Sequence, residues 1–149
     1  MANERTLVLC KPDAVQRGHV GRIISRFENK GLKIAGMKML HVDAALAERH
    51  YQEHVEKPFY PMLRDFITSS PVIALAIEGD NAVEVVRTLG GVTNPQKADP
   101  GTIRGDLGIN FTKNLVHGSD SPASAEREIS LFFSEDELFD YAMTIAEWL

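Results

Sequence analysis

The sequence predicts one domain that mixes helices and strands, on three observations. Its 149 residues are the size of a single domain, and no repeat or linker divides residues 1–149. Its composition, 44% hydrophobic and 25% charged, is typical of a folded globular protein. Its hydrophobic patterns alternate in the order β-α-β-α-β-α-β-α along the chain. Both a parallel sheet and a split βαβ arrangement produce this order, so the pattern alone leaves two architectures open.

Four segments predict the strands: residues 5–11, 32–42, 72–77 and 115–116. The first is apolar or β-favouring and ends at Pro12, because proline cannot donate to the hydrogen-bond ladder of a sheet. The third is a continuous apolar run of six residues. A short apolar run of this length predicts a strand that is buried on both faces.

The helices are expected at residues 20–27, 43–54, 63–67, 82–89 and 121–132, with a last helix that begins at Ser134. The first has apolar residues at i, i+3, i+4 and i+7 from Val20 and is followed by Gly31, a typical helix stop. Asp43 is expected to cap the second helix. Ser134 and Glu137 have the spacing of a capping box. Residues 57–61 and the long, glycine- and proline-containing stretch 91–110 are predicted loops, and a loop of the latter length is usually functional.

The charges exclude some classes of partner. There are 16 basic and 21 acidic residues, for a net charge of −5, which argues against a nucleic-acid binder or an anionic-membrane protein. The longest apolar runs fall far short of the roughly 18 residues that span a bilayer, and the first residues do not resemble a signal peptide. Cys10 is the single cysteine, so no intrachain disulfide is expected and a reducing cytoplasm is the expected location.

The positive charge is uneven along the chain. Residues 1–40 hold eight basic and three acidic side chains, and residues 87–117 hold four and two. An anionic ligand is most easily placed at these two segments. On charge alone, attraction between oppositely charged segments within the fold is the simpler explanation.

Several common catalytic motifs are absent. The sequence contains no P-loop, no dinucleotide fingerprint, no nucleophile elbow and no protein-kinase signature. His50 and His54 lie four residues apart on an expected helix, a spacing that can hold a metal. Because no third ligand is evident, a solvated helix face is the favoured interpretation.

The densest polar cluster is the segment 114–121, where a strand gives way to a helix. His117 lies at the end of that strand and precedes Gly118, and Glu128 follows eleven residues later on the helix. A carboxylate there can orient the imidazole and raise the basicity of its free nitrogen. A neutral histidine can take a phosphoryl group as a phosphoramidate. The alternative is a structural histidine at a strand end.

Three cations and two aromatic residues elsewhere in the sequence are of the types that bind phosphates and bases. Lys11, Arg87 and Arg104 lie near the ends of expected elements, and phosphoryl transfer needs positive charge on the transferred oxygens. Each of the three taken singly is better explained as a solvated charge. Phe59 and Tyr60, in a proline-flanked loop, can stack on a base, although ordinary packing is the simpler role for Phe59.

Four motifs, in order along the chain, carry a family resemblance. They are TLVLCKPDAV at residues 6–15, KPFY at 57–60, VTNP at 92–95 followed by PGTIRGD at 100–106, and NLVHGSDS at 114–121. Together they resemble the nucleoside diphosphate kinases over essentially the whole chain. The resemblance implies an α+β, ferredoxin-like βαββαβ fold with a four-stranded antiparallel sheet covered by helices.

The resemblance also implies the roles of individual residues. His117 matches the phosphoryl carrier, modified on Nδ1, and Glu128 matches the residue that hydrogen-bonds the other side of its ring. The matched catalytic set is His117, Glu128, Lys11, Tyr51, Asn114, Ser119 and Asp120. The matched nucleotide-binding set is Lys11, Phe59, Leu63, Arg87, Thr93, Arg104, Phe111 and Asn114. Phe111 stands where a smaller aliphatic residue is commoner, which leaves the fine nucleotide preference open.

The implied reaction is transfer of a γ-phosphoryl group from a nucleoside triphosphate to a nucleoside diphosphate. It is expected to be ping-pong, with broad tolerance of base and sugar, and to use Mg²⁺ held mainly by phosphates and water rather than by protein ligands. A homo-oligomer is implied, a hexamer with a tetramer as the alternative, and Pro95 lies in a loop that helps subunits assemble in this family. No membrane and no specific nucleic acid is expected as a partner. The rival hypothesis is a non-catalytic binding module on the same fold.

Overall fold

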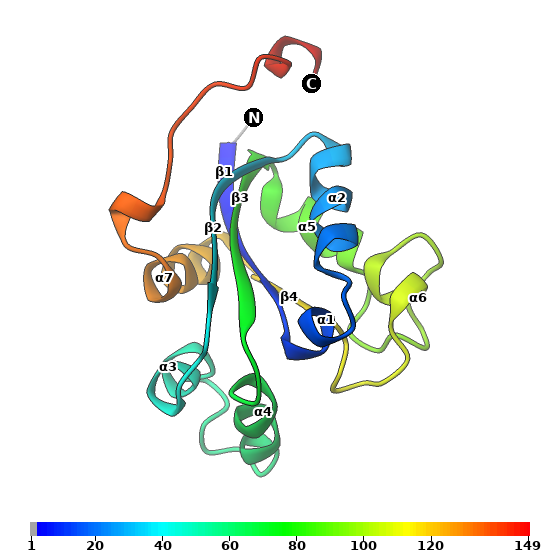
Figure 1. Cartoon of the computed structure of the whole chain (residues 1–149), viewed down its shortest axis with the longest axis vertical. Coiled ribbons are helices and arrows are strands. Elements are labelled where there is room, and N and C mark those ends of the chain that lie inside the picture. The colour runs from blue at the N-terminus through cyan, green and yellow to red at the C-terminus, as the bar shows by residue number, and fades with distance from the viewer. Residues whose placement is uncertain (1–2) are drawn as a thin grey trace.

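Four strands form one antiparallel sheet in the order β2-β3-β1-β4 (Figure 1). The computed structural model describes residues 3–149, and the strands are β1 (Asn3–Cys10), β2 (Lys33–Leu40), β3 (Val72–Asp80) and β4 (Val116–Gly118). The pairings of β1 with β3, β1 with β4 and β2 with β3 are all antiparallel. The ferredoxin-like α+β fold is therefore confirmed, and the parallel sheet that the pattern left open is excluded.

Helices cover both faces of this sheet. They are α1 (Pro12–Gln16), α2 (Val20–Lys30), α3 (Ala44–His50), α4 (Tyr60–Ile67), α5 (Ala82–Gly90), α6 (Ile103–Leu107) and α7 (Pro122–Phe132), with 3₁₀ turns η1 (Glu135–Glu137) and η2 (Ala146–Trp148). Helix α7 lies on one face, α2 and α5 lie on the other, and α3 and α4 lie at one end of the sheet (Figure 1). None of the helices in residues 3–149 combines the length and the hydropathy needed to cross a bilayer.

The two inner strands are buried on both faces, as expected for the apolar run at 72–77. In β3, Ala74 packs into the core on the α7 side, whereas Leu75 packs into the core under α2 and α5. In β1, Leu9 likewise packs on the α7 side, and Val8 packs under α2 and α5. Because successive side chains of a strand point to opposite faces, β1 and β3 each contribute to two cores.

Several element boundaries differ from those expected. Pro12 does end β1, but it also begins α1, because a proline at the first position of a helix has no N–H to lose. Helix α3 ends at His50 rather than near residue 54, and α4 begins at Tyr60 rather than at residue 63. Asp43 caps α3 as predicted, with its side chain accepting a hydrogen bond from the Leu46 N–H at 2.8 Å.

The predicted last helix from Ser134 is wrong. Ser134 N donates to Glu137 Oε1 at 2.9 Å, but only the single turn η1 forms. The chain then runs beside the edge strand β2, where Phe139 N donates to Ala35 O at 2.8 Å and the Tyr141 hydroxyl donates to Ile34 O at 2.6 Å. The unpaired backbone groups of an edge strand can accept such bonds, and these two contacts with β2 hold the segment in an extended path instead of a helix.

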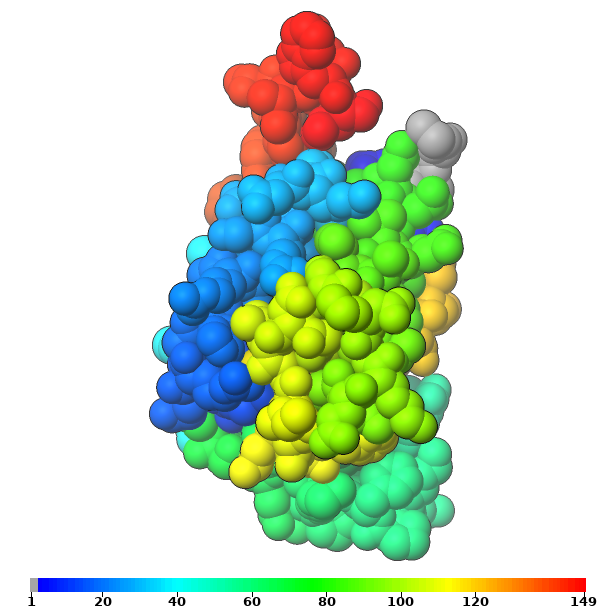
Figure 2. Space-filling view, turned by 90° about the vertical axis from the view of Figure 1, so that its right-hand side faces the viewer, coloured from blue at the N-terminus to red at the C-terminus, as the bar shows by residue number. Residues whose placement is uncertain are grey.

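The long stretch 91–110 is also more ordered than a simple loop, because it contains α6. Arg26 of α2 joins it to the body of the protein by donating to Gly101 O and to Asp106 Oδ2, both at 2.7 Å. Figure 2 shows this stretch, in yellow and yellow-green, packed against the blue N-terminal helices. The stretch is therefore held in place before any ligand binds.

A buried carboxylate links three strands of the sheet at one end. Glu78 is 7% exposed and accepts hydrogen bonds from Arg5 Nε at 2.6 Å and Asn3 Nδ2 at 3.1 Å, with Lys33 Nζ at 2.9 Å. Burial alone raises the pKa of Glu78, but the hydrogen bonds from Lys33, Arg5 and Asn3 outweigh it and hold the pKa below its usual value of 4.5. The carboxylate is therefore charged in the folded protein at neutral pH.

We expect Glu78→Gln to lower the free energy of unfolding by about 1–2 kcal/mol at pH 7, since the neutral amide loses the charge-assisted bonds. A carboxylate whose pKa is lowered by folding stabilises the fold at pH values above its unfolded-state pKa. This stabilisation is lost as the pH falls through the folded-state pKa. The deficit of Glu78→Gln should therefore shrink below about pH 4.5. Urea unfolding of both proteins at pH 7 and pH 4 measures this, and a deficit that does not change with pH would contradict it.

Candidate active site

A cavity of about 260 Å³ opens at the end of the sheet where β1 and β4 meet α3 and α5. The predicted site residues that line it are Lys11, Tyr51, Arg87, Thr93, Arg104, Asn114, His117, Asp120 and Glu128. They come from segments far apart in the sequence. The fold thus brings together most of the two predicted sets in one place.

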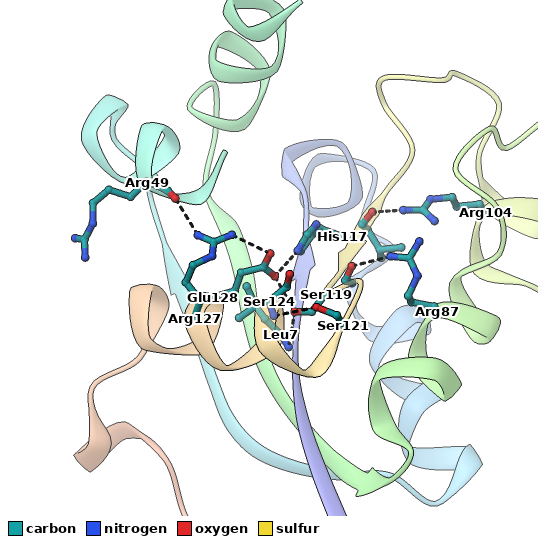
Figure 3. Close-up of polar contacts among 12 residues, drawn as sticks. Leu7, Arg49, Arg87, Arg104, His117, Ser119, Ser121, Ser124, Arg127 and Glu128 are labelled. Atoms are coloured by element: carbon teal, nitrogen blue, oxygen red, sulfur yellow. Dashed lines mark hydrogen bonds and ion pairs between the residues drawn. The ribbon is translucent and has the colours of Figure 1, made fainter. Parts of the chain in front are cut away.

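His117 is oriented by a buried carboxylate. Its Nε2 lies 2.8 Å from Glu128 Oε1, and the Ser119 hydroxyl donates to the same oxygen at 2.7 Å (Figure 3). Because a carboxylate can only accept, the neutral ring carries its proton on Nε2, which leaves the lone pair on Nδ1. Burial raises the pKa of Glu128, but the hydrogen bonds from His117 and Ser119 bring it below its usual value. Glu128 is thus an anion that stabilises positive charge on the ring.

Ser119 does not line the cavity. It is fully buried behind it, and its hydroxyl also accepts a hydrogen bond from the Leu7 N–H at 3.3 Å. Ser119 therefore connects Glu128 to strand β1. This contact restrains the position of the carboxylate rather than reaching a ligand.

The residue directly before the strand that carries His117 has an unusual backbone conformation. Leu115 is fully buried and has φ 78°, in the left-handed region that a residue with a Cβ rarely adopts. Its N–H donates to Asp13 Oδ2 at 3.0 Å, and its carbonyl accepts from the Lys11 N–H at 2.8 Å. The junction of β1 and α1 therefore holds the residue two positions before His117 in place.

We expect Asp13→Ala to lower the free energy of unfolding by ~1–3 kcal/mol, because the buried Leu115 N–H loses its acceptor. Asp13→Asn is the matched control, since its amide oxygen can still accept that bond. Urea unfolding should show most of the stability restored in Asp13→Asn. Equal losses in the two variants would mean that the carboxylate charge, and not the bond to Leu115, is what matters.

Arg104 organises the backbone around the cavity. Its Nη1 donates to Gly91 O at 2.8 Å, its Nε to Asn114 O at 3.2 Å and its Nη2 to Val116 O at 2.6 Å. Gly91 has φ 85°, and a Cβ there would lie 2.5 Å from Thr102 Oγ1, so only glycine fits. Two backbone segments, at Gly91 and at residues 114–116, thus meet at one guanidinium.

The cations of the cavity are crowded. Burial, followed by the charge of Arg87, lowers the pKa of Arg104 to about 10. Burial, followed by the charge of Arg104, lowers the pKa of Lys11 to about 8, although Asp13 opposes this. Because each positive charge is disfavoured by desolvation and by its neighbours, an anion bound between them relieves both costs.

Neutral polar groups complete the same wall of the cavity. Lys11 Nζ donates to Asn114 Oδ1 at 2.8 Å, and Asn114 Nδ2 donates to the Thr93 and Phe111 carbonyls at 3.2 and 3.0 Å. On the opposite side, burial, followed by the nearby Tyr60 and Glu128, raises the pKa of Tyr51 to about 12. Tyr51 therefore keeps its hydroxyl proton as a donor at neutral pH.

The predicted base-binding residues lie outside the cavity lining. Phe59 and Phe111 are 44% and 60% exposed, and Leu63 is half-buried. Phe59 contacts His54 of the cavity wall, with ring centroids 5.7 Å apart. Tyr60 is only 6% exposed at the start of α4, so the expectation that it stacks on a base is wrong.

The sequence interpretation missed other residues of the cavity, namely His50, Glu53, His54, Ser124 and Arg127. The expected solvated face is wrong for His50, which is 4% exposed and packs edge-on against the His117 ring with centroids 4.7 Å apart. Burial, followed by the adjacent His117, lowers the pKa of His50 to about 3, so this ring is neutral. Arg127 donates to Arg49 O at 3.1 Å and lies 3.7 Å from Glu128 Oε2 (Figure 3).

The histidine has a nitrogen with a free lone pair, and it lies beside cations that a bound anion would stabilise. Such a site is suited to accept a phosphoryl group. The fold and this site define the class of protein: an enzyme that transfers phosphoryl groups.

The family follows from comparison with known proteins. A family model described as nucleoside diphosphate kinase matches residues 4–138. The nucleoside diphosphate kinase of Archaeoglobus fulgidus is 59% identical over 146 residues, which cover 98% of this chain and 97% of that protein. That of Pyrococcus horikoshii is 59% identical over 148 residues, covering 97% and 94%. The chain belongs to the nucleoside diphosphate kinase family.

Solved structures agree with this assignment. A halophilic nucleoside diphosphate kinase from Halobacterium salinarum in complex with CDP has a TM-score of 0.96 at 50% identity, covering 99% of this chain and 98% of that chain. A transition-state mimic of the Borrelia burgdorferi enzyme, with bound vanadate and ADP, has a TM-score of 0.91 at 39% identity, covering 96% and 94%. The family and these neighbours support nucleotide phosphate transfer as the reaction class.

Proposed function

We propose that this enzyme moves the γ-phosphoryl group of a nucleoside triphosphate to a nucleoside diphosphate in two steps, through phosphorylated His117. The observation that carries the proposal is the 2.8 Å contact between His117 Nε2 and Glu128 Oε1. It fixes the ring and its proton, so that Nδ1 keeps the lone pair. The ring belongs to the same cavity wall as Lys11, Arg87 and Arg104.

In the first step, Nδ1 of His117 attacks the γ-phosphorus, and the bond to the bridging oxygen of the departing diphosphate breaks. The phosphoryl group remains on His117 as a phosphoramidate. Because Nδ1 has no proton to lose, no general base is required, and Glu128 stabilises the positive charge that the ring acquires. A second nucleoside diphosphate reverses the step and takes the phosphoryl group.

The remaining predicted residues bind and position the nucleotide. Lys11, Arg87 and Arg104 neutralise the charge of the phosphates and of the transferred oxygens. Tyr51, Thr93, Asn114 and Asp120 line the same cavity and offer polar contacts to the phosphates and the ribose. Ser119 acts through Glu128.

We further propose that Mg²⁺ would be held mainly by the nucleotide phosphates and water, with no direct protein ligand. Among the described residues, the one cluster with metal-ligand spacing is His50, His117 and Glu128, and two imidazoles do not suit an ion that prefers oxygen. Glu53 and Asp120 line the cavity and offer carboxylates to metal-bound water. When bound, the metal would neutralise part of the charge of the phosphates.

Base and sugar tolerance is proposed to be broad, because Phe59 and Phe111 offer aromatic faces that accept any base. The loop that carries Phe111 approaches α4, with Thr112 Oγ1 lying 4.0 Å from Met62 Sδ, so the two rings belong to neighbouring segments. The relatives solved with CDP and with ADP support acceptance of both pyrimidine and purine. Which base binds better is decided by how the large Phe111 side chain packs.

Assembly and location complete the proposal. We propose a homo-oligomer, a hexamer with a tetramer as the alternative, and the exposed Met37 and Met39 on the edge strand β2 support contacts between copies. The single cysteine, Cys10, is free and buried, which supports a cytoplasmic location.

Incubation of the protein with γ-labelled ATP and Mg²⁺, followed by rapid quenching, tests the reaction. The expected result is a covalent label that survives alkali and is lost in acid, as a phosphoramidate is. His117→Ala should remove it, whereas His41→Ala, a control at an exposed histidine outside the cavity, should retain it. Folded wild-type protein that takes up no label, or a label that persists in His117→Ala, overturns the proposal.

A further inference from the structure

One buried side chain at the site has no explanation in phosphoryl transfer. His50 is 4% exposed, and neither of its ring nitrogens has a hydrogen-bond partner among the described residues. The ring is held by edge-on aromatic contacts with His117, Tyr51 and Phe132, with centroid distances of 4.7, 4.7 and 5.4 Å. Buried polar groups normally have a partner, so an imidazole held in place with two unpaired nitrogens is suited to bind a ligand.

The unpaired imidazole belongs to a cluster with the spacing of a metal site. One ligand atom each from His50, His117 and Glu128 lies within 4.8 Å of the other two. The three residues come from three separate elements, α3, β4 and α7. All three also line the 260 Å³ cavity, which leaves room for water as a further ligand.

The chemistry of these ligands selects the kind of ion. Imidazole nitrogens favour Zn²⁺ and its neighbours in the first transition row, whereas Mg²⁺ takes oxygen ligands. Two histidines, one carboxylate and an open position form a known type of zinc site. On a tetrahedral ion with bonds near 2.1 Å, ligand atoms lie about 3.4 Å apart. The 2.8 Å contact between His117 Nε2 and Glu128 Oε1 must therefore lengthen by roughly half an ångström, a shift of side chains alone.

We propose that His50, His117 and Glu128 bind a transition-metal ion of the zinc type, and that this ion stops phosphoryl transfer. Coordination through His117 Nε2 displaces the proton from that nitrogen. The neutral ring then carries a proton on Nδ1, delivered through solvent. Nδ1 thereby loses the lone pair that the reaction needs. The metal site itself is independent of the proposed function, whereas the inhibition rests on it.

Titration of the nucleotide-free protein with Co²⁺ tests the site directly, because Co²⁺ replaces Zn²⁺ and absorbs visible light strongly when it is four-coordinate. We expect saturation at one Co²⁺ per chain, with displacement by Zn²⁺ but not by Mg²⁺. His50→Phe keeps the aromatic packing and removes one ligand, so the affinity should fall at least tenfold. His54→Gln is the matched control on the same cavity wall and should keep the affinity of the wild type.

A second readout separates this proposal from the proposed function. Zn²⁺ added before γ-labelled ATP and Mg²⁺ should block labelling of His117 in the wild type, and any labelling that remains in His50→Phe should resist Zn²⁺. Absence of the Co²⁺ spectrum, or equal Co²⁺ affinity in wild type and His50→Phe, overturns the metal site. If Co²⁺ binds as expected but the wild type is never labelled, the phosphohistidine mechanism fails and the metal site stands.

Discussion

His117→Asn is expected to lower kcat/KM for phosphoryl transfer at least about 10⁴-fold, because the asparagine amide cannot replace the imidazole Nδ1 as the nucleophile. Asparagine keeps a polar side chain of smaller size beside Glu128, and the cations that contact phosphates are unchanged. The dissociation constant for a nucleoside diphosphate should therefore change only a few-fold. A steady-state assay gives the first quantity and a binding titration gives the second.

The two measurements separate chemistry from binding. If His117→Asn loses nucleotide affinity in parallel with activity, the ring contributes to binding rather than to the bond-making step. If kcat/KM falls less than tenfold, His117 is not the phosphoryl carrier. Glu128→Gln offers an intermediate case, because a neutral amide can still orient the ring but cannot stabilise its positive charge.

Arg104→Lys is expected to produce the second largest loss, about 10²–10³-fold in kcat/KM. The guanidinium holds three backbone carbonyls at 2.6–3.2 Å and still has N–H groups free for an anion. An ammonium group keeps the charge but cannot bridge three acceptors in a plane. We also expect a loss of ~1–3 kcal/mol in the free energy of unfolding, measured by urea denaturation.

Arg26→Lys is the matched control for this prediction. Arg26 also anchors the 91–110 stretch, through Gly101 O and Asp106, but it does not line the cavity. Its replacement should affect stability by no more than ~1 kcal/mol and leave kcat/KM within a few-fold of the wild type. If both variants lose activity equally, Arg104 acts only by holding this stretch in place.

The sequence predicted best those features that depend on local spacing. The apolar period from Val20 identified α2, and Asp43 identified the start of α3 through its capping bond. The segment around His117 could be found because its polar residues are contiguous. The resemblance then decided between two sheet arrangements that the alternation alone could not distinguish.

The features that were missed depend on contacts between distant segments. His50 was assigned to a solvated face because nothing in its own helix shows that His117 and Phe132 cover it. The capping box at Ser134 forms, but it begins only the single turn η1. The residues that follow are extended and bond to the edge strand β2. Asp13 was not singled out, since its acceptor role at Leu115 depends on a conformation that no pattern encodes.

The strand order also has a consequence for how the protein is made. Strand β1 leaves the ribosome before the other three strands, yet its partners are β3 and β4, at residues 72–80 and 116–118. At a synthesis rate of roughly 5–20 residues per second, an apolar strand waits several seconds for its first neighbour. Such non-local pairing slows folding. The apolar strand β1 therefore stays without its sheet partners until β3 emerges, and the cavity forms only once α7 has been synthesised.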